Sequence, residues 1–233
     1  MGYYGFYDPT YILVLIGALL SILASSKVKS TYQKYHKVRS ATGMTGAEAA
    51  ERILHANGIY DVGIEHVAGD LSDHYDPTHK KLRLSDSTFN ATSVAAIGVA
   101  AHECGHALQH KEEYIPLKIR SAIVPAANFG SRLGIPIIIL GVILGSNPFL
   151  IELGIWVFSL AVLFQVITLP VEFNASKRAL NILSATGTLT ADELTGAKKV
   201  LNSAALTYVA ALFSSILQLL RLLLLTQRRN DRD

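Results

Sequence analysis

Long apolar runs constrain the fold of this chain more than any other feature of its sequence. There are four of them, at residues 11–24, 133–144, 153–169 and 204–225. A helix needs roughly 17 to 25 mostly apolar residues to cross the hydrocarbon core of a bilayer. Half of the 233 residues are hydrophobic and only 17% are charged, which is too apolar for an ordinary soluble domain. The sequence therefore predicts a mainly α-helical membrane bundle with three to four apolar helices.

The charges beside the first run predict the direction in which it crosses. We expect the first membrane helix at residues 11–26, and no Lys or Arg precedes it, which favours a retained anchor over a cleaved signal. Cytoplasmic segments of membrane proteins carry an excess of Lys and Arg. Such residues follow this run directly: Lys27, Lys29, Lys34, Lys37 and Arg39. We therefore expect the N-terminus outside and residues 27–131 in the cytoplasm.

The second and third runs are expected to form a membrane hairpin. Its helices would cover residues 133–149 and 152–170, and Gly145-Ser146-Asn147-Pro148 is a strong turn signal between the two apolar runs. The first arm is barely long enough to span a bilayer, so a buried helical hairpin of a soluble protein is the alternative. Residues 171–203 are expected to form cytoplasmic helices.

The last apolar run, expected as a helix at residues 204–226, leaves its own topology open. A fourth crossing would place the arginines that follow the run outside, against the usual distribution of positive charge. Arg221 lies inside the run and favours the other possibility, a helix that packs on protein without crossing.

The region between the first two runs predicts a small α+β portion. Thr45-Gly46-Ala47-Glu48 has the pattern of a capping box, so a helix is expected from there to about residue 56. Apolar and polar residues alternate at 61–67 and 81–84, which predicts two strands. A polar loop is expected between them, at residues 69–77. Residues 80–84 would offer a free sheet edge on which an unfolded chain could pair.

Two histidines stand four residues apart in His102-Glu103-Cys104-Gly105-His106, within a helix expected at about residues 91–110. Residues with this spacing share one face of a helix, so both imidazoles can reach the same ion. Neutral imidazole is a favoured zinc ligand, and catalytic zinc usually has three protein ligands and a water. Glu103 would lie beside the metal, where a general base takes a proton from that water. Cys104 falls on the opposite, apolar side of the helix and is expected to be a core residue.

Glu172 is the best candidate for the third ligand. It follows the third apolar run, and a carboxylate on a second helix would complete a set of two histidines and one glutamate. Glu172 could instead simply mark the membrane–water boundary. His110 continues the histidine row, but eight helical residues rise about 12 Å, too far for one ion to bind His102 and His110 together. His74 and Tyr75 are candidates for stabilising an oxyanion.

Four motifs in order, at residues 43–48, 69–77, 101–109 and 171–176, resemble the YugP-like neutral zinc metallopeptidases of bacterial membranes. The resemblance implies that His102 and His106 bind Zn²⁺, that Glu103 is the catalytic base and that Glu172 is the third metal ligand. A more distant similarity is to HtpX-like membrane proteases, whose third-ligand motif is E-x-x-A-D.

This chain has Ser176 where the HtpX-like motif has Asp, so the contacts around the ligands would differ there. Ser176 could give only a neutral hydrogen bond to a ligand histidine, and Asn174 is a possible substitute.

We therefore expect a membrane-embedded zinc endopeptidase of the cell membrane, with several spanning helices and its active site on the cytoplasmic side. Its partners would be polypeptides, among them unfolded or membrane proteins, together with membrane lipid but no nucleic acid. A zinc-binding scaffold or sensor without protease activity is the alternative, although such a site has no need of Glu103. A transporter would require His102 and Glu172 at bilayer depth, which the charged residues directly after the histidine helix argue against.

Overall fold

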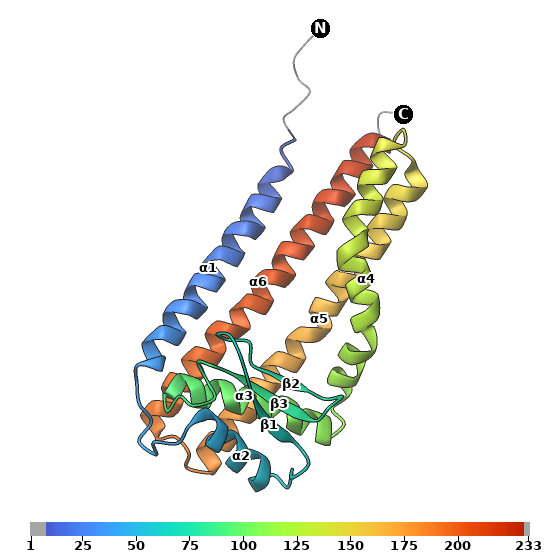
Figure 1. The fold of residues 1–233 in the computed structure, drawn as a ribbon. Coiled ribbons are helices and arrows are strands. Elements are labelled where there is room, and N and C mark those ends of the chain that lie inside the picture. Colours follow the sequence, from blue (N-terminus) through green and yellow to red (C-terminus); the bar gives the residue numbers. More distant parts are fainter. Residues whose placement is uncertain (1–7, 231–233) are drawn as a thin grey trace. The chain divides into compact units, whose positions relative to one another are not determined.

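The computed structural model describes residues 8–230 and shows a mainly helical chain with one small sheet (Figure 1). Four of its helices are long and apolar enough to cross a membrane. The elements in chain order are α1 (Tyr11–His36), α2 (Gly46–Ala56), β1 (Gly63–Val67), β2 (His74–Asp76), β3 (Lys81–Ser85), α3 (Val94–Lys111), α4 (Ile115–Ile143), α5 (Pro148–Ala185) and α6 (Ala191–Asn230).

The described residues form two compact units. The helical unit contains residues 8–24, 119–168 and 207–230, and the mixed unit contains residues 25–118 and 169–206. Each of the long helices α1, α4, α5 and α6 continues from one unit into the other.

The long helices extend well beyond the apolar runs that revealed them. The first continues past residue 26 to His36, and the second begins at Ile115 rather than at residue 133. The third does not end at residue 170 but continues to Ala185, and the fourth begins at Ala191 rather than at residue 204. The helices therefore extend past the segments expected to span the membrane, because an apolar run marks the part of a helix suited to lipid and not the ends of the helix.

The first half of α4 was not predicted from the sequence, because this helix contains prolines and basic residues. This helix contains Pro125 and Pro136 in its interior, and it carries Lys118, Arg120 and Arg132. Proline removes one backbone hydrogen bond and normally kinks or ends a helix in water. Membrane helices tolerate proline better, because neighbouring groups satisfy the backbone atoms that it leaves unpaired.

In the helical unit, α1 and α6 run in opposite directions side by side. Ser21 and Ser214 share a hydrogen bond of 3.0 Å, and Ser214 also donates to the carbonyl oxygen of Gly17 at 2.8 Å. Arg221 pairs with Asp8 at 3.0 Å and stacks over the ring of Tyr11. The charge inside the last apolar run is thus matched by a partner at the start of α1.

The mixed unit begins with the expected helix. Thr45 caps α2, since its hydroxyl accepts from the backbone of Glu48 at 3.2 Å while the Glu48 carboxylate accepts from the backbone of Thr45 at 2.8 Å. This confirms the capping box. Ser93 caps α3 in a similar way, accepting from the backbone of Ala96 at 3.2 Å, so α3 begins a few residues after the expected start at 91.

The sheet has the strand order β1-β3-β2, in which β1 is parallel to β3 and β2 is antiparallel to it. Two expectations were therefore wrong. The polar segment 69–77 is not entirely loop, because His74–Asp76 forms β2. The segment 80–84 is not a free edge, because β3 is the central strand and is paired on both sides.

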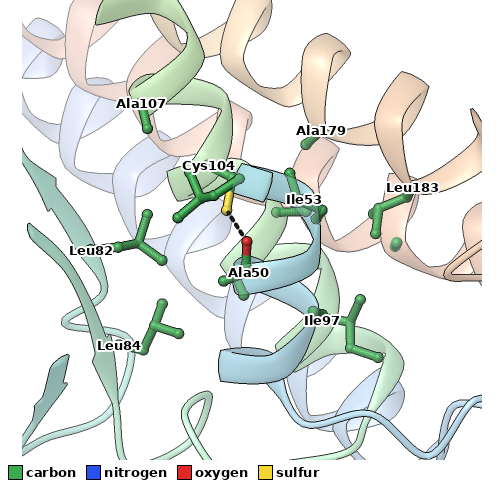
Figure 2. Close-up of a cluster of buried hydrophobic side chains, with 14 of the residues drawn as sticks. Ala50, Ile53, Leu82, Leu84, Ile97, Cys104, Ala107, Ala179 and Leu183 are labelled. Atoms are coloured by element: carbon green, nitrogen blue, oxygen red, sulfur yellow. Dashed lines mark hydrogen bonds between the residues drawn. The ribbon is translucent and has the colours of Figure 1, made fainter. Parts of the chain in front are cut away.

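A cluster of buried hydrophobic side chains joins the sheet to residues of α2, α3, α5 and α6 in the mixed unit (Figure 2). Leu82 and Leu84 of β3 are fully buried, and they face side chains of α2 and α3. Cys104 is fully buried in this cluster, where its thiol donates to the carbonyl oxygen of Ala50 at 3.6 Å. This burial confirms Cys104 as a core residue and raises the pKa of its thiol.

Candidate metal centre

Helix α3 brings the two histidines of the motif to one face. The rings of His102 and His106 meet edge to face with centroids 4.8 Å apart. Helix α5 supplies Glu172, whose Oε2 atom lies 3.3 Å from His102 Nε2 and 3.6 Å from His106 Nε2. Within residues 8–230 these three form the one group of His, Cys, Asp or Glu side chains close enough to hold a metal ion.

A close approach between the backbones of Gly105 and Ala175 makes this convergence possible. Gly105 lies between the two histidines on α3, and Ala175 lies between Glu172 and Ser176 on α5. A Cβ atom on Gly105 would stand 2.5 Å from the carbonyl oxygen of Ala175, well inside the distance that real contacts allow. The absence of a side chain therefore lets α3 and α5 approach closely at the level of the three ligand candidates.

The separations among the candidate ligand atoms suit zinc. A tetrahedral zinc ion with bonds of about 2.0–2.1 Å keeps its ligand atoms about 3.3–3.4 Å apart. The two distances from Glu172 Oε2 to the imidazole nitrogens, 3.3 and 3.6 Å, are close to that value. The donor set of two imidazoles and one carboxylate is one that catalytic zinc sites use.

Hydrogen bonds behind the rings turn both Nε2 atoms toward Glu172. His102 Nδ1 is 3.0 Å from the Ser176 hydroxyl, and His106 Nδ1 is 3.0 Å from Gln109 Oε1. A histidine that binds a metal through Nε2 carries its proton on Nδ1 and donates it to such a neighbour. Ser176 thus contacts His102, and it would be an acceptor rather than a donor if His102 held a metal through Nε2.

The orientation of Gln109 is determined by its other contacts. Its Nε2 group donates to the carbonyl oxygen of Val171 at 2.8 Å and to Asn174 Oδ1 at 3.0 Å. Asn174 Oδ1 also accepts from Arg178 Nε at 2.7 Å, so that atom is an acceptor. With both amide hydrogens used, Gln109 presents its oxygen to His106. Asn174 therefore acts on His106 only through Gln109, and it does not take the place of Ser176 beside His102.

Gln109 was missed by the sequence analysis. It is fully buried, three residues after His106 and so on the same side of the helix. A buried amide next to a predicted metal ligand was the available signal, but its partners on α5 stand too far along the chain to be inferred.

Glu103 is nearly buried, with 8% of its surface exposed, and points toward the sheet. Its Oε2 atom accepts a hydrogen bond of 3.0 Å from the backbone N–H of Tyr75, in the edge strand β2. This contact holds the carboxylate beside the histidines through a group on a different element. The sequence suggested the Tyr75 side chain, whereas it is the backbone of that residue that meets the site.

The side chains of both oxyanion candidates, Tyr75 and His74, have hydrogen-bond partners away from the three candidate ligands. The Tyr75 hydroxyl pairs with His110 Nδ1 at 2.8 Å, and burial raises the pKa of Tyr75 to about 12, so the phenol stays neutral. His74 is exposed, and its Nδ1 atom pairs with the carbonyl oxygen of Ser72 at 2.9 Å. His110 is also exposed, at the end of α3, in keeping with a surface position.

The electrostatics of the centre favour a cation. Burial alone would lower the pKa of His106, but its hydrogen bond to Glu172 and the charge of Glu103 outweigh burial and raise that pKa. The largely buried carboxylates of Glu103 and Glu172 thus favour positive charge next to the imidazoles. A divalent cation would supply that charge.

The comparisons with known proteins place the chain in a class. A family model described as "Putative neutral zinc metallopeptidase" matches residues 10–227. The match covers most of the sequence, so this chain belongs to the neutral zinc metallopeptidase family, as the four motifs indicated.

A curated relative gives a more particular likeness. The chain is 50% identical over 224 residues to "Putative membrane protease YugP" of Bacillus subtilis (strain 168), a match that covers 96% of this chain and 99% of the relative. No solved structure matches the chain. The four apolar helices and this relative together support a membrane protein.

Proposed function

We propose that this chain is a membrane-embedded zinc endopeptidase that hydrolyses peptide bonds. The observation that carries the proposal is the convergence of His102, His106 and Glu172 from two helices, with Glu103 beside them. The zinc metallopeptidase family and the similar membrane protease support the same reaction class.

Each residue of the centre has a role in this mechanism. Zn²⁺ would be held by His102, His106 and Glu172. The ion would lower the pKa of a water molecule and polarise the peptide carbonyl. Glu103 takes the proton from the attacking water and passes it to the amine that leaves. The N–H of Tyr75 engages Glu103 Oε2, which fixes the carboxylate and leaves its second oxygen for the proton.

The substrate in this proposal is a polypeptide in extended form, such as an unfolded protein or a segment of a membrane protein. Strand β2 is at the edge of the sheet, and the backbone of its residue Tyr75 adjoins Glu103. An extended chain can join an edge strand as an added strand. Because the N–H of Tyr75 is held by Glu103, the arriving chain would use the other backbone groups on this edge of β2. We therefore move the expected pairing edge from residues 80–84 to β2.

The proposed location is the cell membrane, with the centre on the cytoplasmic side. The lysines at positions 27, 29, 34 and 37 belong to the mixed unit, which also contains the candidate ligands. Because positive charge concentrates on the cytoplasmic side, this unit would face the cytoplasm. With four crossings, α6 would then carry the C-terminus to the opposite side, antiparallel to α1.

Glu103→Gln tests the catalytic role. The amide keeps the shape of the side chain but cannot take a proton, so cleavage of an unfolded casein-like substrate should fall by about 10²–10⁴-fold. Zinc content, measured by elemental analysis, should stay at the wild-type level. Glu113→Gln, an exposed carboxylate just after α3, is the matched control and should retain activity. A Glu103→Gln protein that still digests casein would overturn the assignment of the base.

A zinc-binding scaffold or sensor remains the competing class, and metal analysis separates the two. A structural zinc site normally has four protein ligands, whereas this group of described side chains has three and so leaves a position for water. Glu172→Ala should lose most of its zinc together with its activity. If the wild type binds zinc but cleaves no polypeptide under any condition, the scaffold interpretation stands instead.

A further inference from the structure

A groove between α5 and α6 in the mixed unit is lined by none of the candidate metal ligands, and Ser176, which contacts His102, lies on its wall. It has a volume of about 560 Å³. Lys177 and Asn181 line it from α5, while Lys198 and Asn202 line it from α6. Each pair has the spacing i, i+4, so both members lie on one face of their helix. Two ammonium groups and two amides therefore face one cavity from two helices.

The two lysines and the two asparagines of this groove lack partners among the described residues, whereas Ser176 and Thr195, which also line it, have hydrogen bonds of their own. Neither lysine forms an ion pair with any residue in the described part of the chain, and neither asparagine side chain has a hydrogen bond there. None of the residues that line the groove is acidic. A cavity with two unpaired positive charges and several donors suits an anion that has several oxygen atoms.

The position of the lysines along their helices indicates the source of such an anion. Lys177 stands eight residues after Leu169, where the apolar run of α5 ends and the mixed unit begins. Lys198 stands eight residues before Leu206, the equivalent boundary on α6. Eight helical residues rise about 12 Å. The flexible lysine side chains can reach back over part of that length to the headgroup layer.

The groove also has an apolar part. Phe173, Leu180 and Leu194 line it together with the polar residues, and Phe173 is 49% exposed. Phe173 is close to the boundary at Leu169, so apolar surface continues from the lysines toward the apolar end of α5. A molecule with a phosphate at one end and hydrocarbon at the other would match this sequence of basic and then apolar surface along α5.

We propose that this groove is a binding site for an anionic phospholipid, whose phosphate is held by Lys177 and Lys198 and hydrogen-bonded by Asn181 and Asn202. The acyl chains would leave the groove past Phe173. This inference concerns lipid binding by the membrane-anchored chain and does not depend on the proposed peptidase reaction.

The test measures lipid affinity rather than proteolysis. The full-length chain in a mild detergent is titrated with fluorescent short-chain phosphatidylglycerol, and with phosphatidylcholine of the same chain length. The wild type should bind the anionic lipid at least about tenfold more tightly. A lysine close to an anionic lipid surface contributes about fivefold in affinity, so Lys177→Gln/Lys198→Gln should bind about thirtyfold more weakly.

Two further variants control for charge and for folding. Lys29→Gln/Lys37→Gln removes the same charge from exposed positions of the mixed unit outside the groove, and should change affinity by less than about threefold. Lys177→Arg/Lys198→Arg keeps the charge and should keep most of the binding. Equal losses in both glutamine variants would overturn the proposal, since they would reveal diffuse surface attraction.

Competition distinguishes the sources of the anion. Inorganic phosphate should displace the labelled lipid only at concentrations far above that of the lipid. Displacement by phosphate or by an acidic peptide at equal concentration would instead assign the groove to a soluble anion or to a polypeptide. Equal affinity for the two lipids would likewise contradict the proposal. Zinc content is expected to be unchanged in all variants, so failure here leaves the peptidase proposal untouched.

Discussion

The two units of this chain hold their helices together in different ways. In the mixed unit, side chains such as Leu82, Ile97 and Leu183 are completely buried, as in the core of a water-soluble protein. In the helical unit, large apolar side chains remain exposed, among them Trp156 at 76% and Leu15 at 64%. Burial away from water can stabilise the first unit by itself, whereas the second requires lipid around its exposed surface.

The same contrast extends to polar groups. Around the candidate metal centre, Gln109 uses both of its amide hydrogens and its oxygen. In the helical unit, Gln165 Oε1 and Arg221 Nε are buried without a hydrogen-bond partner in the described chain. The buried amide beside the candidate metal centre is therefore fully hydrogen-bonded, which would help a site to hold its geometry, whereas polar groups in the helical unit are matched less completely.

Close helix contacts at glycine occur in both units but serve different ends. Gly105 allows α3 to approach Ala175 of α5 and thereby joins the candidate ligands. Gly134 allows α4 to approach Phe158 of α5, where an added Cβ would stand 2.8 Å from the Phe158 side chain. The first contact lies at the candidate metal centre, and the second packs two of the helices that are long and apolar enough to cross a membrane.

Substitution at these two glycines should give the largest difference between the units. Gly105→Ala forces α3 and α5 apart at the ligands, and a displacement of about 1 Å can cost about 10²-fold in rate. We expect it to lose most of its zinc and at least that much activity. Gly134→Ala should lower the melting temperature in detergent but keep zinc at the wild-type level. Elemental analysis of both purified variants is the measurement, and full zinc in Gly105→Ala would show that the close approach is not what assembles the site.

The sequence predicted the part of the site that depends on local spacing. Two histidines and a glutamate within five positions of one helix lie near each other by helix geometry alone. Glu172 could be suggested only through its position after an apolar run and through the family resemblance. That α3 and α5 meet at Gly105 is a tertiary fact, and nothing in the pattern of residues indicated it.

The ends of the long helices could not be predicted for a related reason. Helix α5 passes through residue 170 with Pro170 in its interior and no capping residue, so composition changes there while the backbone does not. The helix α2, by contrast, was predicted closely because Thr45 and Glu48 cap its start by local contacts. Local chemistry could be predicted, and features set by packing between distant segments could not.

The two candidate ligands His102 and His106 should differ in how strongly zinc binding depends on the hydrogen-bond partners of their Nδ1 atoms. Removing a hydrogen-bond partner of a zinc ligand typically costs 10–100-fold in metal affinity. Gln109→Leu should fall near the upper end, because Gln109 is fully buried and its loss also leaves the buried His106 Nδ1 without its partner. Ser176→Ala should fall near the lower end, because the His102 side chain is 15% exposed and water can replace the hydroxyl.

Zinc affinity for these two variants would be measured by competition with a chelator of known strength. A matched pair of controls is available in the helical unit, where Ser159→Ala and Gln165→Leu change the same residue types and should leave zinc affinity unaltered. A larger loss in Ser176→Ala than in Gln109→Leu would contradict the idea that burial sets the size of the effect.

The smallest expected effect concerns acid and the strand pair β2–β3. Asp76 accepts hydrogen bonds from His79 Nδ1 at 2.8 Å and from Arg83 Nη1 at 2.7 Å, and these contacts lower its pKa, with that from His79 contributing most. A carboxyl whose folded pKa is lowered stabilises the fold above its unfolded pKa of about 3.9, and that contribution is lost as the pH falls through the folded pKa. Hydrogen exchange of residues 74–85, in metal-free protein, should therefore be slower in the wild type than in Asp76→Asn at pH 7, and the difference should shrink below about pH 4. The fluorescence of Trp156 reports on the helical unit and should be the same in both proteins throughout. A difference in exchange that persists undiminished at pH 3 would show that the charge of Asp76 is not what secures this edge of the sheet.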